Sequence, residues 1–184
     1  YRLIHTGQHY DKNMSSDFFD QLEIPAPHKN LKCGGGTQAE QTANIMIAFE
    51  KELVENPTNL VLVVGDVTST MACAIVAQKC HTKVAHVEAG IRSLDWTMPE
   101  EINRLVTDSI TNYFFTTSKN ANMHLEKSGI EKDRVFFVGN TMIDTLLKQK
   151  PNFIKPKFWN NLNLKKRNYI VITLHRPANV DQEN

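Results

Sequence analysis

Residues 85–104, AHVEAGIRSLDWTMPEEINR, decide how this chain is organised. The mainly apolar segment 83–87 predicts a buried strand, and the segment that begins at Glu100 predicts a helix. Glu88 follows the strand directly, and Glu100 and Glu101 follow the loop. A strand that ends in a carboxylate, with two more carboxylates after a loop, indicates acid–base groups at the rim of a pocket.

A second junction of the same kind lies upstream, where the apolar run 60–64 ends at Gly65-Asp66. Strand and helix patterns alternate through most of the chain. Strands are expected at 1–6, 60–64, 83–87, 113–116 and 135–138, and helices at 17–22, 38–55, 68–79, 101–112, 119–128 and 142–148. This alternation predicts an α/β fold with a Rossmann-like parallel sheet and helices on both faces. The continuous run 60–64 predicts a central strand that is covered on both faces.

The pattern changes between residues 150 and 168, where prolines, lysines and asparagines cluster. We therefore predict three parts: an N-terminal domain over residues 1–150, a linker over 151–168, and the start of a second domain over 169–184. A strand is expected at 169–174. Because the chain has no initiator methionine and stops soon after this new strand, we expect it to be a fragment.

Composition limits the classes of partner. A formal net charge of +1 argues against nucleic-acid or membrane-surface binding driven by bulk charge, so we expect neither partner. No apolar run reaches the roughly 18 residues that a transmembrane helix needs. Three irregularly spaced cysteines suit a reducing cytosol better than a disulfide framework. We expect a cytoplasmic protein whose thiols are structural.

Polar side chains follow four of the expected strands. They are Gln8 with His9, Asp66, Glu88 and His175. One such residue is commonly a helix cap. In an open α/β sheet, however, ligands bind beyond the carboxyl ends of the strands. Four groups at such ends therefore favour a functional site over four unrelated caps.

Two other kinds of site stay open. Gly34-Gly35-Gly36 is neither a dinucleotide fingerprint nor a Walker A loop, but a helix follows it and its N-terminus could face a phosphate. Asp66, His86 and Glu88 could together hold a divalent metal ion, because carboxylates and imidazole ligate several such ions. We expect three other histidines to face solvent: His28, His81 and His124.

Six motifs, taken in order, resemble those of one family. They are TGQHYD (6–11), GD (65–66), HVEAGIR (86–92), PEEINR (99–104), VGNT (138–141) and TLHR (173–176). The family is that of the non-hydrolysing UDP-N-acetylglucosamine 2-epimerases, which make UDP-N-acetylmannosamine. The resemblance runs the length of the chain and implies one half of a two-domain GT-B type fold, with the active site between the domains. It also implies a homodimer that supplies cell-surface polysaccharide precursors.

The resemblance implies a reaction without a redox cofactor or a metal. UDP is eliminated to give a 2-acetamidoglucal, and UDP then adds back while a proton reaches the opposite face of C2. Such a route needs acid–base groups on both faces of the sugar ring. It also needs stabilisation of an oxocarbenium-like transition state, for which carboxylates are suited.

Residue roles follow from the matching motifs. The resemblance implies four catalytic residues: Asp66, Glu88, Glu100 and His175. It implies five residues that bind the substrate, UDP-N-acetylglucosamine or UDP: Gln8, His9, Arg92, Arg104 and Arg176. Arg92 and Arg104 are expected to orient the carboxylates or hold the loop, although plain structural ion pairs are an alternative. Glu101 is expected to point into the helix start or into solvent.

Alternatives to this function remain. One is a hydrolysing 2-epimerase, which releases free N-acetylmannosamine and UDP. Others are a non-catalytic module that binds nucleotide sugars and a metal-dependent hydrolase. The chain differs from many relatives at Gly34-Gly35-Gly36, and Tyr10-Asp11 follow the TGQH loop, so regulation by substrate is undecided. We expect the 184-residue chain alone to be inactive, because half of the cleft would be absent.

Overall fold

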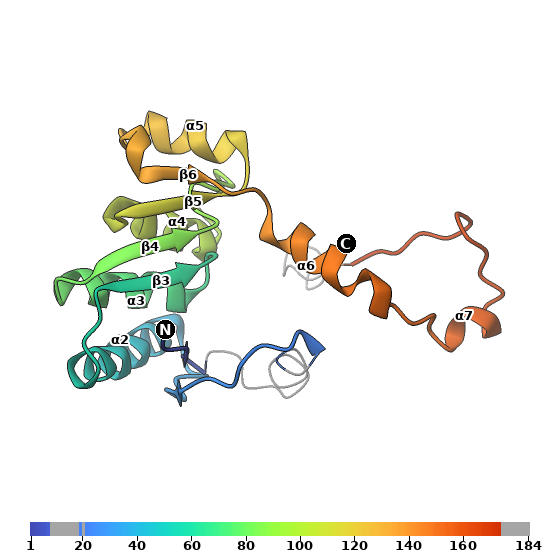
Figure 1. The fold of residues 1–184 in the computed structure, drawn as a ribbon, viewed down its shortest axis with the longest axis horizontal. Helices are drawn as coiled ribbons and strands as arrows, with labels where there is room; N and C mark the ends of the chain where they lie inside the picture. The colour runs from blue at the N-terminus through green and yellow to red at the C-terminus, as the bar shows by residue number, and fades with distance from the viewer. Residues whose placement is uncertain (8–18, 20, 174–184) are drawn as a thin grey trace. The chain divides into compact units, whose positions relative to one another are not determined.

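A computed structural model describes residues 1–7, 19 and 21–173 (Figure 1). The chain divides into two compact units, Tyr1–Leu146 and Leu147–Asn184. Each unit is described by itself below. The domain boundary expected at residue 150 stays a prediction, as does the linker.

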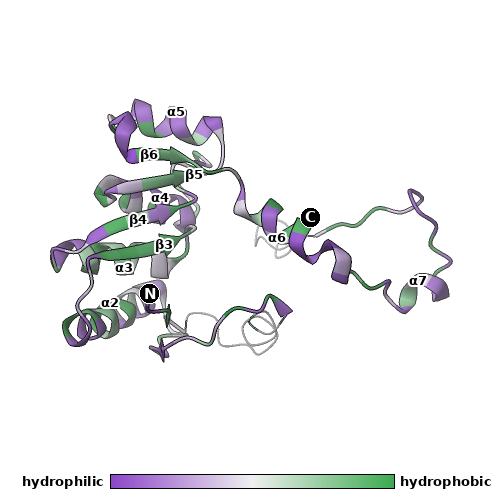
Figure 2. Ribbon diagram, in the orientation of Figure 1, coloured by the Kyte–Doolittle hydropathy of each residue, from purple (hydrophilic) through white to green (hydrophobic). Residues whose placement is uncertain are grey.

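The first unit is built on a parallel sheet with the strand order β3-β4-β5-β6. The strands are β3 (Leu60–Val64), β4 (Lys83–Val87), β5 (Tyr113–Thr116) and β6 (Val135–Phe137). The connecting helices are α3 (Thr68–Lys79), α4 (Pro99–Ile110) and α5 (Lys119–Lys127). The strands are mostly hydrophobic, and α5 is mostly hydrophilic (Figure 2). The predicted α/β class, with a Rossmann-like parallel sheet flanked by helices, is confirmed.

The segment before the sheet contributes a long helix and a small second sheet. Helix α2 (Gln38–Glu55) spans the predicted range, and strands β1 (Ile4–His5) and β2 (Lys29–Asn30) pair in parallel. Buried Glu52 ties them together. Its carboxylate contacts Arg2 at 2.6 Å and Lys29 at 2.9 Å. The predicted helix at 17–22 falls mostly outside the described residues.

The core lies between the sheet and helices α2 and α3. Ile45 of α2 is fully buried, and three alanines of α3 are fully buried as well: Ala72, Ala74 and Ala77. Burial raises the pKa of the neighbouring Cys73 thiol to about 12, so Cys73 stays protonated and acts as a packing residue. Cys33 is also buried, and Cys80 is partly buried.

Strand β3 differs from its prediction. It lies at the edge of the four-stranded sheet, and its side chains alternate between buried and exposed. Val61 and Val63 are buried, whereas Leu60, Leu62 and Val64 are exposed. Successive side chains of a strand point to opposite faces. A uniformly apolar sequence contains no signal of which face is covered, so the expectation of two covered faces was wrong.

The second unit has little regular structure among its described residues. It includes the end of α6 (Thr141–Gln149), a turn of 3₁₀ helix at Lys150–Asn152 and the short helix α7 (Phe158–Asn161). Residues 169–173 form no strand, contrary to the prediction for 169–174. Ile170, Val171 and Ile172 are exposed. The apolar run there has no neighbouring strand, among the described residues, with which to pair.

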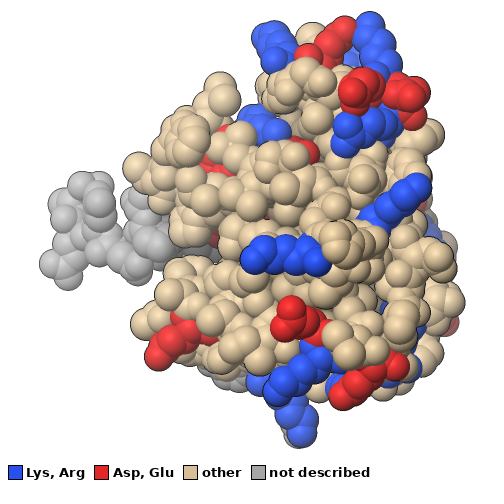
Figure 3. Space-filling model, turned by 90° about the vertical axis from the view of Figure 1, so that its left-hand side faces the viewer, with Lys and Arg blue, Asp and Glu red and all other residues tan. Residues whose placement is uncertain are grey.

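Charged side chains of both signs are interspersed on the face seen in Figure 3. Neither sign forms a continuous field on that face. In the part of the chain that the structure describes, no helix has the length and apolarity needed to cross a membrane.

Replacing Ile45 with alanine should lower the free energy of unfolding by about 2–5 kcal/mol, because the side chain is fully buried and its loss leaves a cavity. Ile47 provides a matched control on the same helix, because it is 55% exposed. The Ile47→Ala change should lower the free energy of unfolding by less than about 0.5 kcal/mol. Urea unfolding followed by far-ultraviolet circular dichroism measures both. Equal losses would contradict this packing of α2.

Candidate functional site

The carboxyl ends of β3 and β4 lie side by side and bring Asp66 and Glu88 to one edge of the sheet. Val64 pairs with Val87, and the Gly65 N–H donates to the Val87 carbonyl at 3.0 Å. A Cβ atom at Gly65 would lie 3.7 Å from Oε2 of Glu88. The Glu88 carboxylate is therefore next to the residue that precedes Asp66. This edge is where open α/β sheets bind ligands.

Glu88 has an unusual backbone conformation. Its φ is +70°, in the left-handed region that non-glycine residues seldom occupy. Its N–H donates to the Phe115 carbonyl of β5 at 3.0 Å, which fixes this turn to the neighbouring strand. Backbone strain of this kind is concentrated at functional sites. The strain therefore supports the assignment of Glu88 as a functional residue.

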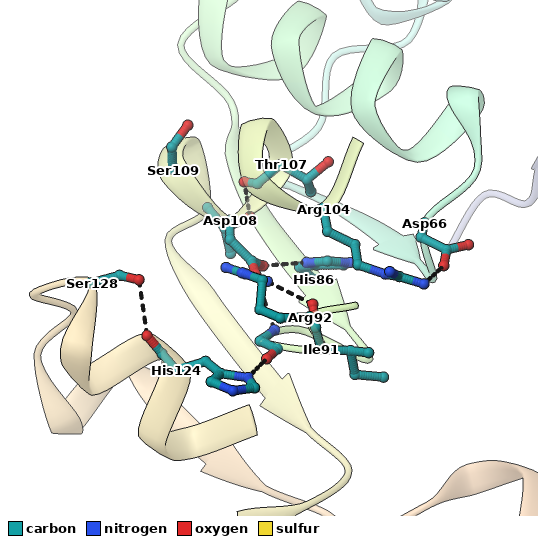
Figure 4. Close-up of polar contacts among 12 residues, drawn as sticks. Asp66, His86, Ile91, Arg92, Arg104, Thr107, Asp108, Ser109, His124 and Ser128 are labelled. Atoms are coloured by element: carbon teal, nitrogen blue, oxygen red, sulfur yellow. Dashed lines mark hydrogen bonds and ion pairs between the residues drawn. The ribbon is translucent and has the colours of Figure 1, made fainter. Parts of the chain in front are cut away.

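Helix α4 holds Asp66 through two side chains. Arg104 forms an ion pair with the Asp66 carboxylate, and Asn103 Nδ2 donates to the Asp66 carbonyl at 2.8 Å (Figure 4 shows the ion pair). The other arm of Arg104 contacts Glu101 at 3.1 Å. Arg104 thus contacts one of the candidate carboxylates, and its expected role in orienting that group stays a prediction.

Glu101 holds the loop that precedes α4. Its Oε2 accepts hydrogen bonds from the Ser93 N–H at 2.8 Å and the Ser93 hydroxyl at 2.9 Å, and Oε1 accepts from the Leu94 N–H at 3.3 Å. Burial alone would raise the pKa of Glu101. The hydrogen bonds from Ser93 and Arg104 outweigh burial and hold that pKa below its usual range. Glu101 is 1% exposed, so the alternative that it points into solvent was wrong.

Asp108 joins both strand-end loops. Its Oδ1 contacts Nδ1 of His86 at 2.7 Å. Its Oδ2 accepts from the Gly90 N–H at 3.0 Å and from Nη1 of Arg92 at 2.7 Å. Figure 4 shows His86 and Arg92 converging on this carboxylate. Arg92 thus connects the loop after Glu88 to α4 through this ion pair, and its expected role in the site stays a prediction.

Gly90 is fixed by helices on two sides. While its N–H bonds to Asp108, its carbonyl accepts from Nδ1 of His124 at 2.9 Å. With φ at +77°, a Cβ atom at Gly90 would lie 2.5 Å from the Ala121 carbonyl oxygen. No side chain fits there. His124 thus contacts the loop, and the expectation that it is simply solvated was wrong.

The metal alternative fails on His86. Its Nε2 lies 2.8 Å from the Gly65 carbonyl, which only accepts, so Nε2 carries the hydrogen. Nδ1 is engaged by Asp108. Neither ring nitrogen has a lone pair available for a metal ion shared with Asp66 and Glu88. Among the described residues, no group of three or more histidine, cysteine, aspartate or glutamate side chains is arranged to hold a metal.

The phosphate-cradle alternative fails at the start of α2. Thr37 and Glu40 form a capping box, in which the Glu40 carboxylate accepts from the Thr37 N–H at 2.8 Å and the Thr37 hydroxyl accepts from the Glu40 N–H. The backbone hydrogen bond from Thr37 lowers the pKa of Glu40. A carboxylate already occupies the position that an anion would take beside Gly34-Gly35-Gly36.

The remaining expected residues fall into two groups. Glu100 is partly buried in the first turn of α4, one helical turn before Asn103, so it lies on the side of α4 that contacts the Asp66 loop. Gln8, His9, His175 and Arg176 lie outside the described residues. The sequence reading did not single out Asp108. Its only local signal is its position seven residues after Glu101 and four after Arg104, which is helical spacing.

An open hollow of about 540 Å³ lies between helices α2, α3 and α4. It is lined mainly by apolar side chains, including Met46, Met71 and Ile102. Asn103 borders it, but Asp66 and Glu88 do not line it. The two candidate carboxylates therefore lie outside this hollow.

Comparison with known proteins gives a consistent result. The family model for UDP-N-acetylglucosamine 2-epimerase matches residues 1–184. The chain is similar to a UDP-N-acetylglucosamine 2-epimerase homolog of Methanococcus maripaludis, with 46% identity over 97% of this chain and 50% of that protein. It is also similar to the UDP-2,3-diacetamido-2,3-dideoxy-D-glucuronate 2-epimerase of Pseudomonas aeruginosa, with 38% identity over 97% of this chain and 50% of that protein.

Among solved structures, the chain resembles the Methanocaldococcus jannaschii UDP-GlcNAc 2-epimerase in complex with UDP-GlcNAc and UDP. The TM-score is 0.81 and the sequence identity 43%, over 86% of this chain and 44% of that one. The chain spans about half the length of the relatives that it matches.

Replacing Glu101 with glutamine should destabilise the protein by about 2 kcal/mol near neutral pH, because buried hydrogen bonds to a charged carboxylate are lost. The folded-state pKa of Glu101 is lowered, so this stabilisation is present above the unfolded pKa of about 4.3 and is lost as the pH falls through the folded value. Urea unfolding in steps from about pH 7 to about pH 3 gives the free energy of unfolding of the variant and of the unmodified protein. The difference between the two should become smaller toward acid pH.

The matched control is Glu131→Gln. Glu131 also pairs with an arginine three residues on, Arg134 at 2.7 Å, but its side chain is 66% exposed. The Glu131→Gln change should therefore have a much smaller effect. If the loss of unfolding free energy in Glu101→Gln stays constant with pH, the proposed role of the Glu101 charge is contradicted.

Proposed function

This chain belongs to the UDP-N-acetylglucosamine 2-epimerase family, and from that premise we propose that the protein inverts C2 of UDP-N-acetylglucosamine to give UDP-N-acetylmannosamine. The observation that carries the proposal is the pairing of Asp66 and Glu88 at neighbouring strand ends. The Asp66 carboxylate forms a partly buried ion pair with Arg104, and Glu88 is fixed through its backbone N–H and has a strained backbone. UDP-GlcNAc and UDP, the ligands of a solved relative, are the proposed ligands here.

The proposed reaction has two stages. In the first, the C2 proton and the UDP group leave, the C1–O bond breaks, and a C1=C2 double bond forms in a 2-acetamidoglucal. In the second, UDP adds back to C1 and a proton reaches C2 from the opposite face. One base must accept the proton on one face, and one acid must deliver it on the other. Carboxylates also stabilise the positive charge that develops at C1.

Asp66, Glu88 and Glu100 are the proposed acid–base and charge-stabilising groups. Arg104 keeps the Asp66 carboxylate oriented through their ion pair. Fixing such groups before substrate binds lowers the cost of reaching the reactive geometry. We propose further contacts to the nucleotide sugar from residues of the matching motifs: Gln8, His9, His175 and Arg176.

A second candidate substrate has support in one relative. The Pseudomonas aeruginosa protein that is 38% identical over 97% of this chain acts, by its name, on UDP-2,3-diacetamido-2,3-dideoxy-D-glucuronate. That sugar shares the 2-acetamido group and the UDP leaving group, so the same carboxylates could serve it. The difference lies at C3 and C6, where a bulkier and more acidic sugar must fit.

Incubation of the full-length protein with UDP-N-acetylglucosamine in deuterated water tests the main proposal. The C2 proton exchanges with solvent during elimination and re-addition, so deuterium should appear at C2 of a product that keeps UDP. Proton NMR and mass spectrometry measure both features. Free N-acetylmannosamine with an equal amount of UDP would identify a hydrolysing enzyme instead. Turnover of only the diacetamido sugar would identify the second substrate.

Glu88→Gln and Glu100→Gln should each lower kcat by about 10²–10⁴-fold, because glutamine is nearly isosteric but cannot transfer a proton at neutral pH. Glu126→Gln is the control, since Glu126 is 58% exposed on α5 and pairs with Lys132 at 2.9 Å. Its turnover should equal that of the unmodified protein. Unchanged kcat in both test variants would instead favour a non-catalytic binding module.

A further inference from the structure

We infer that Asp108 is the positioning residue that holds both catalytic loops of this site, so that one buried carboxylate sets the geometry between Asp66 and Glu88. The inference rests on the proposed epimerase function. Asp108 is in the last turns of α4 and does not belong to any of the motifs that indicate the reaction. Its role follows from its contacts alone.

The first arm of Asp108 reaches the loop that carries Glu88. Oδ2 accepts from the Gly90 N–H at 3.0 Å and from Nη1 of Arg92 at 2.7 Å. The same Nη1 donates to the Ile91 carbonyl at 2.8 Å. Two backbone groups and one side chain of this loop are thus fixed, directly or through Arg92, by one oxygen atom.

The second arm reaches the loop that carries Asp66. Oδ1 contacts Nδ1 of His86 at 2.7 Å, and Nε2 of the same ring donates to the Gly65 carbonyl at 2.8 Å. Gly65 precedes Asp66 directly. His86 therefore transmits the position of α4 to the end of β3. The two arms together connect the residues on either side of the proposed sugar site.

Burial makes this arrangement rigid. The side chains of Asp108, His86 and Arg92 are 5%, 1% and 7% exposed. Hydrogen bonds strengthen in such low-dielectric surroundings, and a displaced partner would leave a buried polar group unsatisfied. A buried ion pair by itself is weak evidence for stability. Asp108, however, contacts the loop after Glu88 directly and the residue before Asp66 through His86. This connection to both strand ends is what distinguishes a positioning role.

Glu52 provides a matched comparison within the same chain. It is also a buried carboxylate, 2% exposed, and it pairs with Arg2 at 2.6 Å and Lys29 at 2.9 Å. It lies on α2, and among the described residues its side chain bonds to Arg2, Lys29 and Asn56, none of which is in a strand-end loop. If Asp108 were only structural, then Asp108→Asn and Glu52→Gln should have effects of the same kind.

The Asp108→Asn change keeps the shape of the side chain but replaces one acceptor oxygen with an NH₂ donor. The amide oxygen can then accept on only one of the two arms, and the negative charge that pairs with Arg92 is lost. In the full-length protein we expect kcat for epimerisation to fall about 10²-fold with little change in KM, because small displacements of catalytic groups have effects of that size. Glu52→Gln should lower the melting temperature and leave kcat unchanged.

Hydrogen–deuterium exchange of backbone amides supplies a readout that does not depend on the reaction. Asp108→Asn should accelerate exchange in peptides that contain residues 65–66 and 88–92, and Glu52→Gln should not. Single-arm variants sharpen the test and remain usable if Asp108→Asn fails to fold. Arg92→Gln should accelerate exchange at 88–92 only, and His86→Gln at 65–66.

A double-mutant cycle with Glu88→Gln completes the experiment. If Asp108 acts through the position of Glu88, the Asp108→Asn change should add little to the loss caused by Glu88→Gln. A wild-type kcat in Asp108→Asn, an equal loss of kcat in Glu52→Gln, or exchange that is unchanged at both loops would each overturn the inference. Absence of epimerisation by the unmodified protein would overturn the proposed function, whereas the exchange data would still test the two arms.

Discussion

Asp66 and Glu88 follow neighbouring parallel strands, and the proposed site depends on how these two strand ends are held in place. Helix α4 does most of this. Arg104 pairs with Asp66, and Asp108 binds the loop after Glu88 through Gly90 and Arg92. Buried cations beside buried anions are costly to desolvate and add little stability on their own. Their arrangement here is explained by the geometry that they impose on the strand ends.

Local sequence signals were sufficient to predict most helices and strands of the first unit. The ranges of α2, α3, β3, β4 and β5 match their predictions, because apolar runs, cap residues and short connections coincide there. Thr37 caps α2 and Ser118 caps α5, each accepting a backbone N–H as its residue type suggests. The strand ends also indicated Asp66 and Glu88, because the carboxyl ends of parallel strands share one edge.

What the sequence could not provide was set by contacts between distant segments. Asp108 bonds to His86 and Gly90, and His124 bonds to Gly90, across 18 to 34 residues of chain. No local pattern encodes such pairs. The apolar run of β3 likewise contains no signal of which face is covered. Glu100 and Glu101 are adjacent in sequence, yet about 100° apart around a helix, so one holds a buried loop while the other stays partly exposed.

The spacing along α4 explains how one helix carries both the residues that fix the strand-end loops and a residue proposed to take part in the reaction. Glu101, Arg104 and Asp108 recur at intervals of three and four residues, so they lie along one side of the helix and contact the loops at the strand ends. Glu100 and Asn103 lie along the neighbouring stripe, and Asn103 reaches the Asp66 carbonyl. A rigid helix moves all of these groups together. Any displacement of α4 would therefore alter both strand-end loops at once, which makes the position of this helix the quantity that the proposed chemistry depends on.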